Sequence, residues 1–223
     1  MPQQINKKFL LYLFLFFLFG SLNNKNLTEI ELPKIEKINI FGFNEENSNE
    51  LLKNLEFLKF QNLFFLQRLE IEEILRQNDL IDKYSIFKKY PSTLELKINQ
   101  TEFLAYLPKD GKYFFVGSNG RLIESKKKLK KKPIIFGNFR INDFFKLKNS
   151  IDKSNFDYEQ INELFYFPSG RWDIKLRSGK LVKLPIDDLK SSLNLLIKVL
   201  NDIKFQNAKI IDIRQYNQVI ISE

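Results

Sequence analysis

Two pairs of adjacent carboxylates are the residues best suited by type to do chemistry in this chain. Glu72-Glu73 and Asp187-Asp188 would supply a general acid and a general base if their side chains faced each other. Both pairs lie at stretches with helical periodicity, where consecutive side chains diverge by about 100°. They therefore fit the solvated face or the first turn of a helix better than a catalytic pair.

Other catalytic machinery is limited by composition. The 223-residue chain contains no His and no Cys, which excludes Cys–His and Ser–His–Asp catalysis and metal sites built on imidazole or thiolate. No glycine-rich phosphate loop precedes a helix. We predict a protein that is not an enzyme and has no cofactor, metal or small-molecule substrate. The alternative is an envelope enzyme that uses carboxylates alone, which requires two acids facing each other across a cleft.

The basic charge is weak evidence for a ligand. The formal net charge is +9, but Lys, Asn, Ile and Phe are abundant along the whole chain, so nucleic-acid binding is not predicted. The run from Lys126 to Lys132 would either contact acidic lipid or nucleic acid or form a solvated loop that its like charges keep extended. The run has no interleaved aromatic residue and no Arg, which favours the solvated loop.

An apolar run near the N-terminus follows Lys7-Lys8. It is shorter than the roughly 20 residues of a usual membrane span, and no small-x-small cleavage pattern follows it. We predict that residues 1–22 form a cytoplasmic stub and an uncleaved signal anchor, with the N-terminus in the cytoplasm. A cleaved signal peptide is the alternative. The predicted anchor residues are Phe9, Leu10, Leu11, Leu13, Phe14, Leu15, Phe16, Phe17, Leu18 and Phe19.

A polar linker over residues 23–34 precedes a small module over residues 35–105 with the predicted order strand, helix, helix, strand, strand. Leu94, Leu96 and Ile98 alternate with polar residues, as in a half-buried strand.

The two helices of this module are predicted from apolar stripes. The first has Leu51, Leu55 and Leu58 on one face and Asn47 or Ser48 as its N-cap; the second has Ile71, Ile74 and Leu75 and ends near Asn78. Phe64-Phe65-Leu66, between them, is interpreted as core. An exposed aromatic patch for a partner is the alternative.

Residues 106–223 are predicted to form a mainly antiparallel β domain. Asn119-Gly120 and Ser178-Gly179 mark two hairpins, and a short helix is expected within residues 156–167. An amphipathic helix follows, with Asp187 as a possible N-cap, and the chain ends in strands over residues 208–214 and 218–222. The stripe of this helix, which fits packing on a sheet better than a coiled coil, consists of Leu189, Leu193, Leu196, Leu200 and Ile203.

Several motifs resemble a known family. Ile40-Phe41-Gly42 and Tyr90-Pro91-Ser92-Thr93-Leu94, in this order of elements, resemble a POTRA domain, a small protein-docking module. Residues 170–184 read Gly-Arg-Trp-x-Ile-x-Leu-x-x-Gly-x-x-Val-x-Leu, and Ile211-Asp212-Ile213-Arg214 follows the last helix. Behind an N-terminal anchor, this series resembles the FtsQ/DivIB family of bacterial cell-division proteins. Three residues depart from the family's usual Glu, Pro and Trp, namely Gln100, Phe103 and Tyr106.

The resemblance implies an α+β fold and a non-catalytic divisome scaffold. Such a protein would cross the cell inner membrane once, keep its body in the periplasm and concentrate at the division septum. It would link early and late cell-division proteins and dock the FtsB/FtsL pair during septum formation. The alternative is another POTRA-bearing envelope protein, such as an outer-membrane assembly or secretion component.

The partner site implied by the resemblance is the last strand, docking in part by β-augmentation. An edge strand offers unpaired N–H and C=O groups to an added strand. Arg214 matches the family's Arg and would pair with an acidic partner residue, or alternatively with Asp212 of its own strand. The predicted partner-binding residues are Arg214, Tyr216, Gln218, Val219, Ile220, Ile221 and Ser222.

Overall fold

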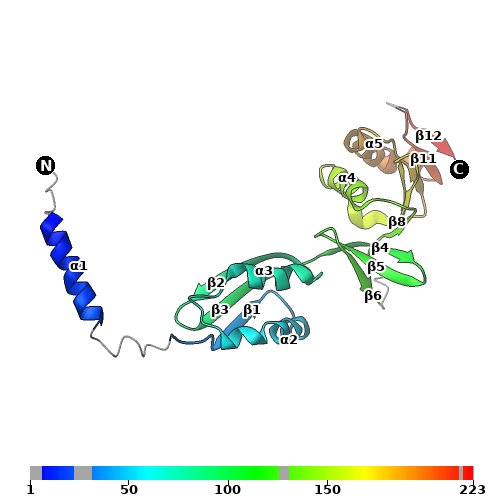
Figure 1. Cartoon of the computed structure of the whole chain (residues 1–223). Helices are drawn as coiled ribbons and strands as arrows, with labels where there is room; N and C mark the ends of the chain where they lie inside the picture. The colour runs from blue at the N-terminus through cyan, green and yellow to red at the C-terminus, as the bar shows by residue number, and fades with distance from the viewer. Residues whose placement is uncertain (1–6, 23–31, 126–130, 216–217, 223) are drawn as a thin grey trace.

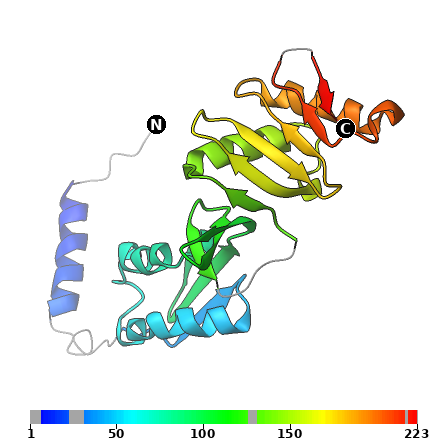
Figure 2. The ribbon, with the colours of Figure 1, turned by 90° about the vertical axis from the view of Figure 1, so that its right-hand side faces the viewer.

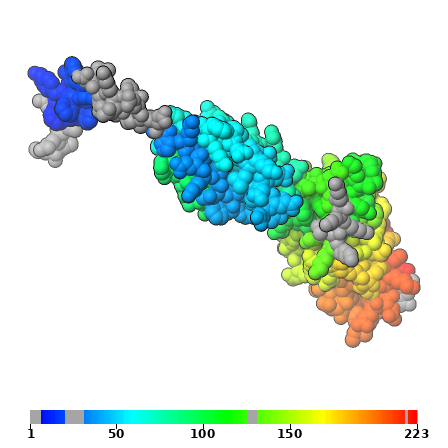
Figure 3. Space-filling model, turned by 90° about the horizontal axis from the view of Figure 1, so that it is seen from below, coloured from blue at the N-terminus to red at the C-terminus, as the bar shows by residue number. Residues whose placement is uncertain are grey.

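The computed structural model describes residues 7–22, 32–125, 131–215 and 218–222 (Figure 1). Beyond helix α1 (Lys7–Leu22), the described chain builds one three-stranded sheet and one nine-stranded sheet, each covered by helices. The three-stranded module and the C-terminal strands of the larger sheet lie at opposite ends of the body (Figure 3). The mixed α+β class is therefore confirmed.

The module with the three-stranded sheet has the predicted order of elements. It consists of β1 (Lys37–Phe41), α2 (Glu45–Asn54), the 3₁₀ helix η2 (Glu56–Phe60), α3 (Arg68–Gln77), β2 (Ile81–Lys89) and β3 (Thr93–Gln100). The strand order is β1-β3-β2, with β1 parallel and β2 antiparallel to β3. The predicted apolar faces form its core, which includes the buried residues Leu51, Leu55, Leu58, Ile71, Leu75, Leu94, Leu96 and Ile98.

Two details of this module differ from the sequence prediction. The N-cap of α2 is Asn44, whose Oδ1 accepts a hydrogen bond from Asn47 N–H at 2.8 Å. Neither Asn47 nor Ser48 is the cap, because both lie within the helix. Glu95 points away from the apolar face of β3 but is buried, since it forms an ion pair with Lys89.

The nine-stranded sheet follows. Its strands are β4 (Phe103–Lys109), β5 (Lys112–Gly117), β6 (Leu122–Ser125), β7 (Ile134–Phe136), β8 (Ile161–Tyr166), β9 (Trp172–Leu176), β10 (Leu181–Lys183), β11 (Ile210–Asp212) and β12 (Ile220–Ser222). They lie in the order β12-β11-β10-β9-β8-β7-β4-β5-β6. Both predicted hairpins are present, as β5–β6 and β9–β10.

Helices α4 (Ile141–Asp152) and α5 (Leu189–Asn201) each carry a crossover of the sheet. The first joins β7 to β8 and the second joins β10 to β11, and both of these strand pairs are parallel. A parallel pair requires such a crossover, because a tight turn would reverse the chain. The buried faces of the helices share one core with the sheet, which includes Phe144, Leu147, Leu193, Leu196, Trp172 and Ile174.

The helices around this sheet were the least predictable elements. The short helix expected within residues 156–167 is the three-residue 3₁₀ helix η3 (Tyr158–Gln160), and strand β8 follows it. Helix α4 was not anticipated. In α5 the N-cap position is held by Asp188, with φ 52° and no side-chain cap bond, so Asp187 is not the cap. The helix ends at Asn201, which leaves Ile203 in η4 (Ile203–Phe205) and 79% exposed.

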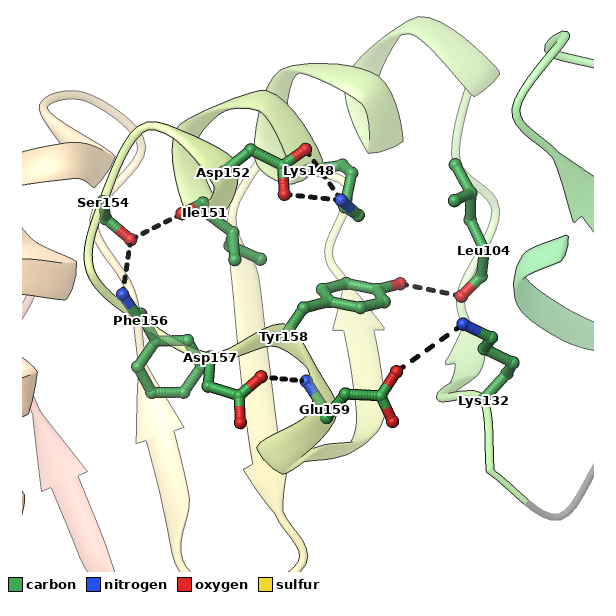
Figure 4. Close-up of polar contacts among 10 residues, drawn as sticks. All are labelled: Leu104, Lys132, Lys148, Ile151, Asp152, Ser154, Phe156, Asp157, Tyr158 and Glu159. Carbon is green, nitrogen blue, oxygen red and sulfur yellow. Dashed lines mark hydrogen bonds and ion pairs between the residues drawn. The ribbon is translucent and has the colours of Figure 1, made fainter. Parts of the chain in front are cut away.

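Tyr158 joins η3 to β4 at the centre of the large sheet (Figure 4). Its hydroxyl donates a hydrogen bond to Leu104 O at 3.0 Å, and Lys148 Nζ lies 4.8 Å from its ring centroid. Burial raises the pKa of this hydroxyl, so it stays a donor at physiological pH. In the same view Lys132, at the end of the lysine run, pairs with Glu159. Residues 126–130 of that run lie outside the described residues.

Helix α1 contains the whole predicted anchor run. Its apolar side chains are mostly exposed in the structure, and it is 16 residues long. Among the described residues, no helix has both the length and the apolar character needed to cross a membrane.

The turn of the β5–β6 hairpin fastens the large sheet to the three-stranded module. The side-chain amide of Asn119 donates to the carbonyl oxygens of Asp79 and Ile81 at 2.9 and 3.0 Å. The Arg121 guanidinium contacts Asp79 Oδ1 at 2.9 Å and donates to Arg76 O at 2.5 Å. These contacts, which we call the hairpin clasp, tie the turn to the end of α3 and the start of β2. The predicted boundary at residue 105 falls inside β4, just after the clasped module.

At Gly117, the end of β5 packs closely against Thr101 and the turn that carries the hairpin clasp. A Cβ on this residue would lie 2.5 Å from Thr101 Cγ2 and 2.6 Å from Asn119 Oδ1. A side chain at this position would therefore displace the turn that carries the clasp.

We expect Asn119→Ala to lower the free energy of unfolding by about 1–2 kcal/mol, because the exposed carbonyl of Asp79 and the partly buried carbonyl of Ile81 lose their donor. Urea unfolding followed by circular dichroism measures the change. Asn99→Ala, at an exposed position of β3, is the matched control and should leave the stability nearly unchanged. Equal stability of both variants would contradict a structural role of the clasp.

Candidate functional site

Strand β12 ends the nine-stranded sheet, as predicted. It pairs antiparallel with β11, and no described residue pairs with its other side. The predicted partner-binding residues on and before this strand are exposed or half-buried, with Ile220 among the exposed ones. Tyr216 lies outside the described residues.

The hydrogen bonds of β11 decide which of its backbone groups are available to β12. Leu181 N–H donates to Lys209 O at 2.8 Å, and Ile213 N–H donates to Lys183 O at 3.1 Å. Because a parallel ladder uses alternate residues, the intervening Ile211 also turns its N–H and C=O toward β10. The residues on either side of Ile211 therefore point their backbone groups toward β12.

This alternation determines which backbone N–H and C=O groups of β12 face away from β11. Ile210 and Asp212 lie opposite Ser222 and Ile220, which makes both of these hydrogen-bonded pairs. Ile221 lies opposite Ile211 in the pair without hydrogen bonds between the two strands. Its N–H and C=O consequently face the free edge, where an added strand would meet them.

Arg214 forms an ion pair with Asp212, one of the two arrangements expected from the sequence. Its Nη2 lies 2.5 Å from Asp212 Oδ2, and its Nε donates to both carboxylate oxygens at 2.9 and 3.0 Å. Hydrogen bonding from this guanidinium lowers the pKa of Asp212, and the carboxylate raises the pKa of Arg214. The Arg214 side chain is still 41% exposed, so part of its guanidinium remains accessible.

A surface cavity of about 760 Å³ lies beside this ion pair. Its lining comes from the turn before β9, the start of α5 and the residues after β11, and it includes Arg171, Ile186, Leu195, Ile213 and Arg214. The charged lining is thus mixed, with the basic residues Arg171, Lys198 and Arg214 and the acidic residues Asp187 and Asp188, beside the exposed apolar side chain of Ile186.

Arg171 was not among the predicted site residues, although it stands in the Gly170-Arg171-Trp172 motif. Its Nε donates to the buried Asp173 at 3.1 Å. Burial raises the pKa of Asp173, and the Arg171 guanidinium opposes that shift. The two arginines line one cavity because β9 pairs with β10 and β10 pairs in parallel with β11, and local sequence patterns do not reveal the second of these pairings.

A second cavity, of about 310 Å³, lies on the other side of Ile186. Two nitrogens of Arg140 donate to Asp143 at 2.8 and 3.1 Å, and the Tyr166 hydroxyl donates to the same carboxylate at 3.1 Å. Hydrogen bonding from Arg140 lowers the pKa of Asp143, while burial raises the pKa of Tyr166. The charged groups of this cluster thus bond to one another, and they line the cavity opposite the loop that carries Ile186.

Of the two pairs of adjacent carboxylates, Glu72-Glu73 and Asp187-Asp188, Glu72 forms ion pairs within its own helix. Glu72 accepts hydrogen bonds from Arg68 and Arg76 along α3, at 2.7 and 3.0 Å. Asp187 and Asp188 line the larger cavity at the start of α5. In the described part of the chain, no three His, Cys, Asp or Glu side chains gather as metal ligands would.

Comparison with known protein families gives two matches that follow one another along the chain. Residues 34–100 match the POTRA domain of FtsQ type. Residues 105–214 match the C-terminal region of cell division protein FtsQ/DivIB. The chain belongs to the FtsQ/DivIB family.

Individual members of this family are similar over different lengths. DivIB of Clostridium botulinum strain Loch Maree is 30% identical over 134 residues, which cover 60% of this chain and 50% of that protein. FtsQ of Rickettsia bellii is 25% identical over 195 residues, which cover 85% of this chain and 72% of that protein. The chain thus spans about half the length or less of the first two curated relatives that it matches.

A solved DivIB structure is also similar. The match to the major extracytoplasmic domain of DivIB from Geobacillus stearothermophilus covers 49% of this chain and 98% of the solved chain. The sequence identity is 17% and the TM-score is 0.37.

Within the FtsQ/DivIB match, the candidate site divides into two parts. Arg171 and Arg214 lie inside the region matched over residues 105–214, and β12 lies beyond it. The cavity with its arginines therefore belongs to the portion similar to other family members, while the free edge is described by this structure alone.

The ion pairs predict opposite titration of two aspartates on neighbouring strands. We expect the carboxyl of Asp212 to titrate below its ordinary pKa of 3.8 and that of Asp173 to titrate above it. Carboxyl ¹³C shifts followed by NMR as the pH is lowered measure both midpoints. The free energy of unfolding that Asp212 contributes is fully present above pH 3.8, and it is lost as the pH falls through the lowered pKa of the folded state.

Arg214→Ala is the matched variant for this titration. Removing the guanidinium should move the Asp212 midpoint up toward 3.8 and affect Asp173 less, because Arg171 remains in place. An Asp212 midpoint that does not move would contradict the assigned cause of the shift.

Proposed function

We propose that this protein is a non-catalytic scaffold of the bacterial divisome that docks the FtsB/FtsL pair by adding a partner strand along β12. The observation that carries this proposal is the outward N–H and C=O of Ile221 on the free edge of β12. A cavity lined by Arg171 and Arg214 lies after the end of the neighbouring strand β11. An added strand needs the first feature for its register, and an acidic side chain on that strand needs the second. Membership in the FtsQ/DivIB family supports a role in division.

The backbone edge and the side chains of the cavity would contribute differently to the free energy of binding. The two outward backbone groups of Ile221 would contribute about 1–3 kcal/mol in total. A micromolar complex requires about 8 kcal/mol. Side-chain contacts in the cavity, where Ile186 and Leu195 offer apolar surface, must therefore supply most of the affinity.

The proposed location is the cell inner membrane, with a single span, a cytoplasmic N-terminus and a periplasmic body concentrated at the septum. The apolar run from Phe9 to Phe19 and the preceding Lys7-Lys8 support this topology. The described helix α1, at 16 residues, would cover about 24 Å of a hydrocarbon core of about 30 Å. Thinning of the bilayer or added turns from the flanking residues would close that difference.

We expect Ile221→Pro to reduce capture of the periplasmic FtsB/FtsL pair by up to about tenfold, because the loss of one hydrogen bond corresponds to at most about 1.4 kcal/mol. Proline removes the outward N–H and leaves the bonds of Ile220 and Ser222 to β11 in place. Pull-down of the partner pair by the full chain, with folding checked by circular dichroism, measures the change.

Two control variants isolate the backbone group. Ile221→Ala removes the side chain that packs against the core but keeps the N–H, so capture should persist. Leu122→Pro removes an outward N–H on β6, at the opposite edge of the same sheet, and should also leave capture intact. Capture by Ile221→Pro at the level of the parent would overturn docking at this edge.

A further inference from the structure

An exposed aromatic patch lies on the three-stranded module, between its two helices. We define the aromatic patch by five residues: Phe60, Phe64, Phe65, Leu69 and Tyr90. Phe60 and Phe65 are each 77% exposed and Leu69 is 65% exposed. The interpretation of Phe64-Phe65-Leu66 as core is therefore correct only for Leu66, which is 4% exposed.

The loop that carries the aromatic patch is held in place from both sides. Asn62 donates from Nδ2 to Pro33 O at 2.9 Å and accepts from Phe64 N–H at 2.8 Å. Lys88 Nζ donates to Leu66 O at 2.7 Å. The aromatic side chains are thus presented on a fixed backbone.

The aromatic patch lies where the described chain joins the module after α1. Lys34 forms an isolated β-bridge with Asn62, which lies between Phe60 and Phe64. Figure 2 shows η2 beside this point, at the opposite side of the module from the large sheet. Any surface that holds α1 would therefore lie near these aromatic residues.

Tyr90, in the turn between β2 and β3, extends the aromatic patch. Its ring centroid lies 4.5 Å from that of Phe64. Phe60, Phe64 and Phe65 line none of the three cavities of about 760, 940 and 310 Å³. The aromatic patch is therefore suited to a broad surface rather than to a ligand enclosed by a pocket.

The surroundings of the aromatic patch carry net positive charge. The three segments that form and flank it, residues 32–37, 56–70 and 88–90, contain six basic and three acidic residues. Three of the basic side chains form ion pairs, Lys59 with Glu56, Arg68 with Glu72 and Lys89 with Glu95. With the two partners outside the segments, Glu72 and Glu95, counted as well, the net charge is +1. Aromatic side chains interleaved with lysines are typical of surfaces that sit in the headgroup region of an anionic bilayer.

We infer that the aromatic patch inserts into the interface of the bilayer that holds α1, an inference that rests on the proposed membrane location. Leu22 and Leu32 are ten residues apart, so the chain between them reaches at most about 36 Å. A membrane-anchored α1 would keep the module within that distance of the lipid surface, which raises the effective concentration of the patch there. The occupant is lipid, with phosphate headgroups facing the lysines.

The contact would also orient the docking edge. The hairpin clasp fastens the large sheet to the module, and β12 lies at the far end of that sheet. With the aromatic patch in the interface, β12 would therefore be held away from the membrane rather than free to swing toward it.

Site-specific tryptophan quenching tests this inference on the full chain. Three variants, Tyr12→Trp in α1, Phe65→Trp in the aromatic patch and Phe136→Trp on the large sheet, are reconstituted in vesicles of brominated phosphatidylcholine mixed with phosphatidylglycerol. The parent, whose one tryptophan is the buried Trp172, gives the baseline. We expect about twofold quenching of the added emission at positions 12 and 65 and no quenching at position 136.

The outcomes separate this inference from the proposed membrane location. Quenching at position 12 without quenching at position 65 would overturn the patch contact and leave the anchor standing. Absence of quenching at both positions would overturn both. If position 65 changed only when the FtsB/FtsL pair was added, the aromatic patch would be a protein-docking surface and the lipid contact would be overturned.

Discussion

The alternation of backbone hydrogen bonds across β10, β11 and β12 is the constraint on which the proposed docking site depends. The bonds of Lys209 C=O and Ile213 N–H to β10 imply that Ile211 between them faces β10 and that Ile210 and Asp212 face β12, and Lys209 N–H donates to Ser222 O at 2.9 Å. Carried across one more strand, the same rule leaves Ile221 facing outward. The crossover through α5 places β11 parallel to β10, with Ile211 opposite Val182. This pairing determines which residues of β11 direct their backbone groups toward β12. A shift of one residue in β11 would turn Ile221 inward and bury its binding groups.

The continuity of the nine-stranded ladder joins this edge to the rest of the molecule. At its other end, the β5–β6 turn holds the three-stranded module through Asn119 and Arg121. The ladder, the clasp and the module therefore form one mechanical connection from the aromatic patch to β12. Such a connection suits a scaffold, since partner binding at one end is placed at a defined distance from the proposed membrane contact at the other.

Much of the fold could be predicted because its signals are local. Leu94, Leu96 and Ile98 alternate with polar residues, and Asn119-Gly120 supports a tight turn, with φ 79° at the glycine. Helix α4 was missed although Phe144, Leu147 and Ile151 follow the i, i+3, i+7 spacing of an amphipathic helix. Its stability comes from packing Phe144 and Leu147 into a core built by distant strands.

The candidate site was only partly predictable for the same reason. The edge position of the last strand and the Arg214–Asp212 alternative were expected from neighbouring residues. That Arg171 and Arg214 line one cavity, and that Ile221 faces outward, both depend on the pairing of β10 with β11, which joins residues 29 positions apart such as Leu181 and Ile210. The exposure of Phe65 depends likewise on Asn62 binding to the segment at Pro33.

Amide hydrogen exchange at Ile221 tests the central claim most directly. In the free chain its N–H should exchange faster than those of Ile220 and Ser222, which bond to β11. On addition of the periplasmic FtsB/FtsL pair, the account predicts that exchange at Ile221 slows by about tenfold or more while exchange at Leu122, on the opposite edge, is unchanged. A complex that forms without slowing exchange at Ile221 would contradict strand addition along β12.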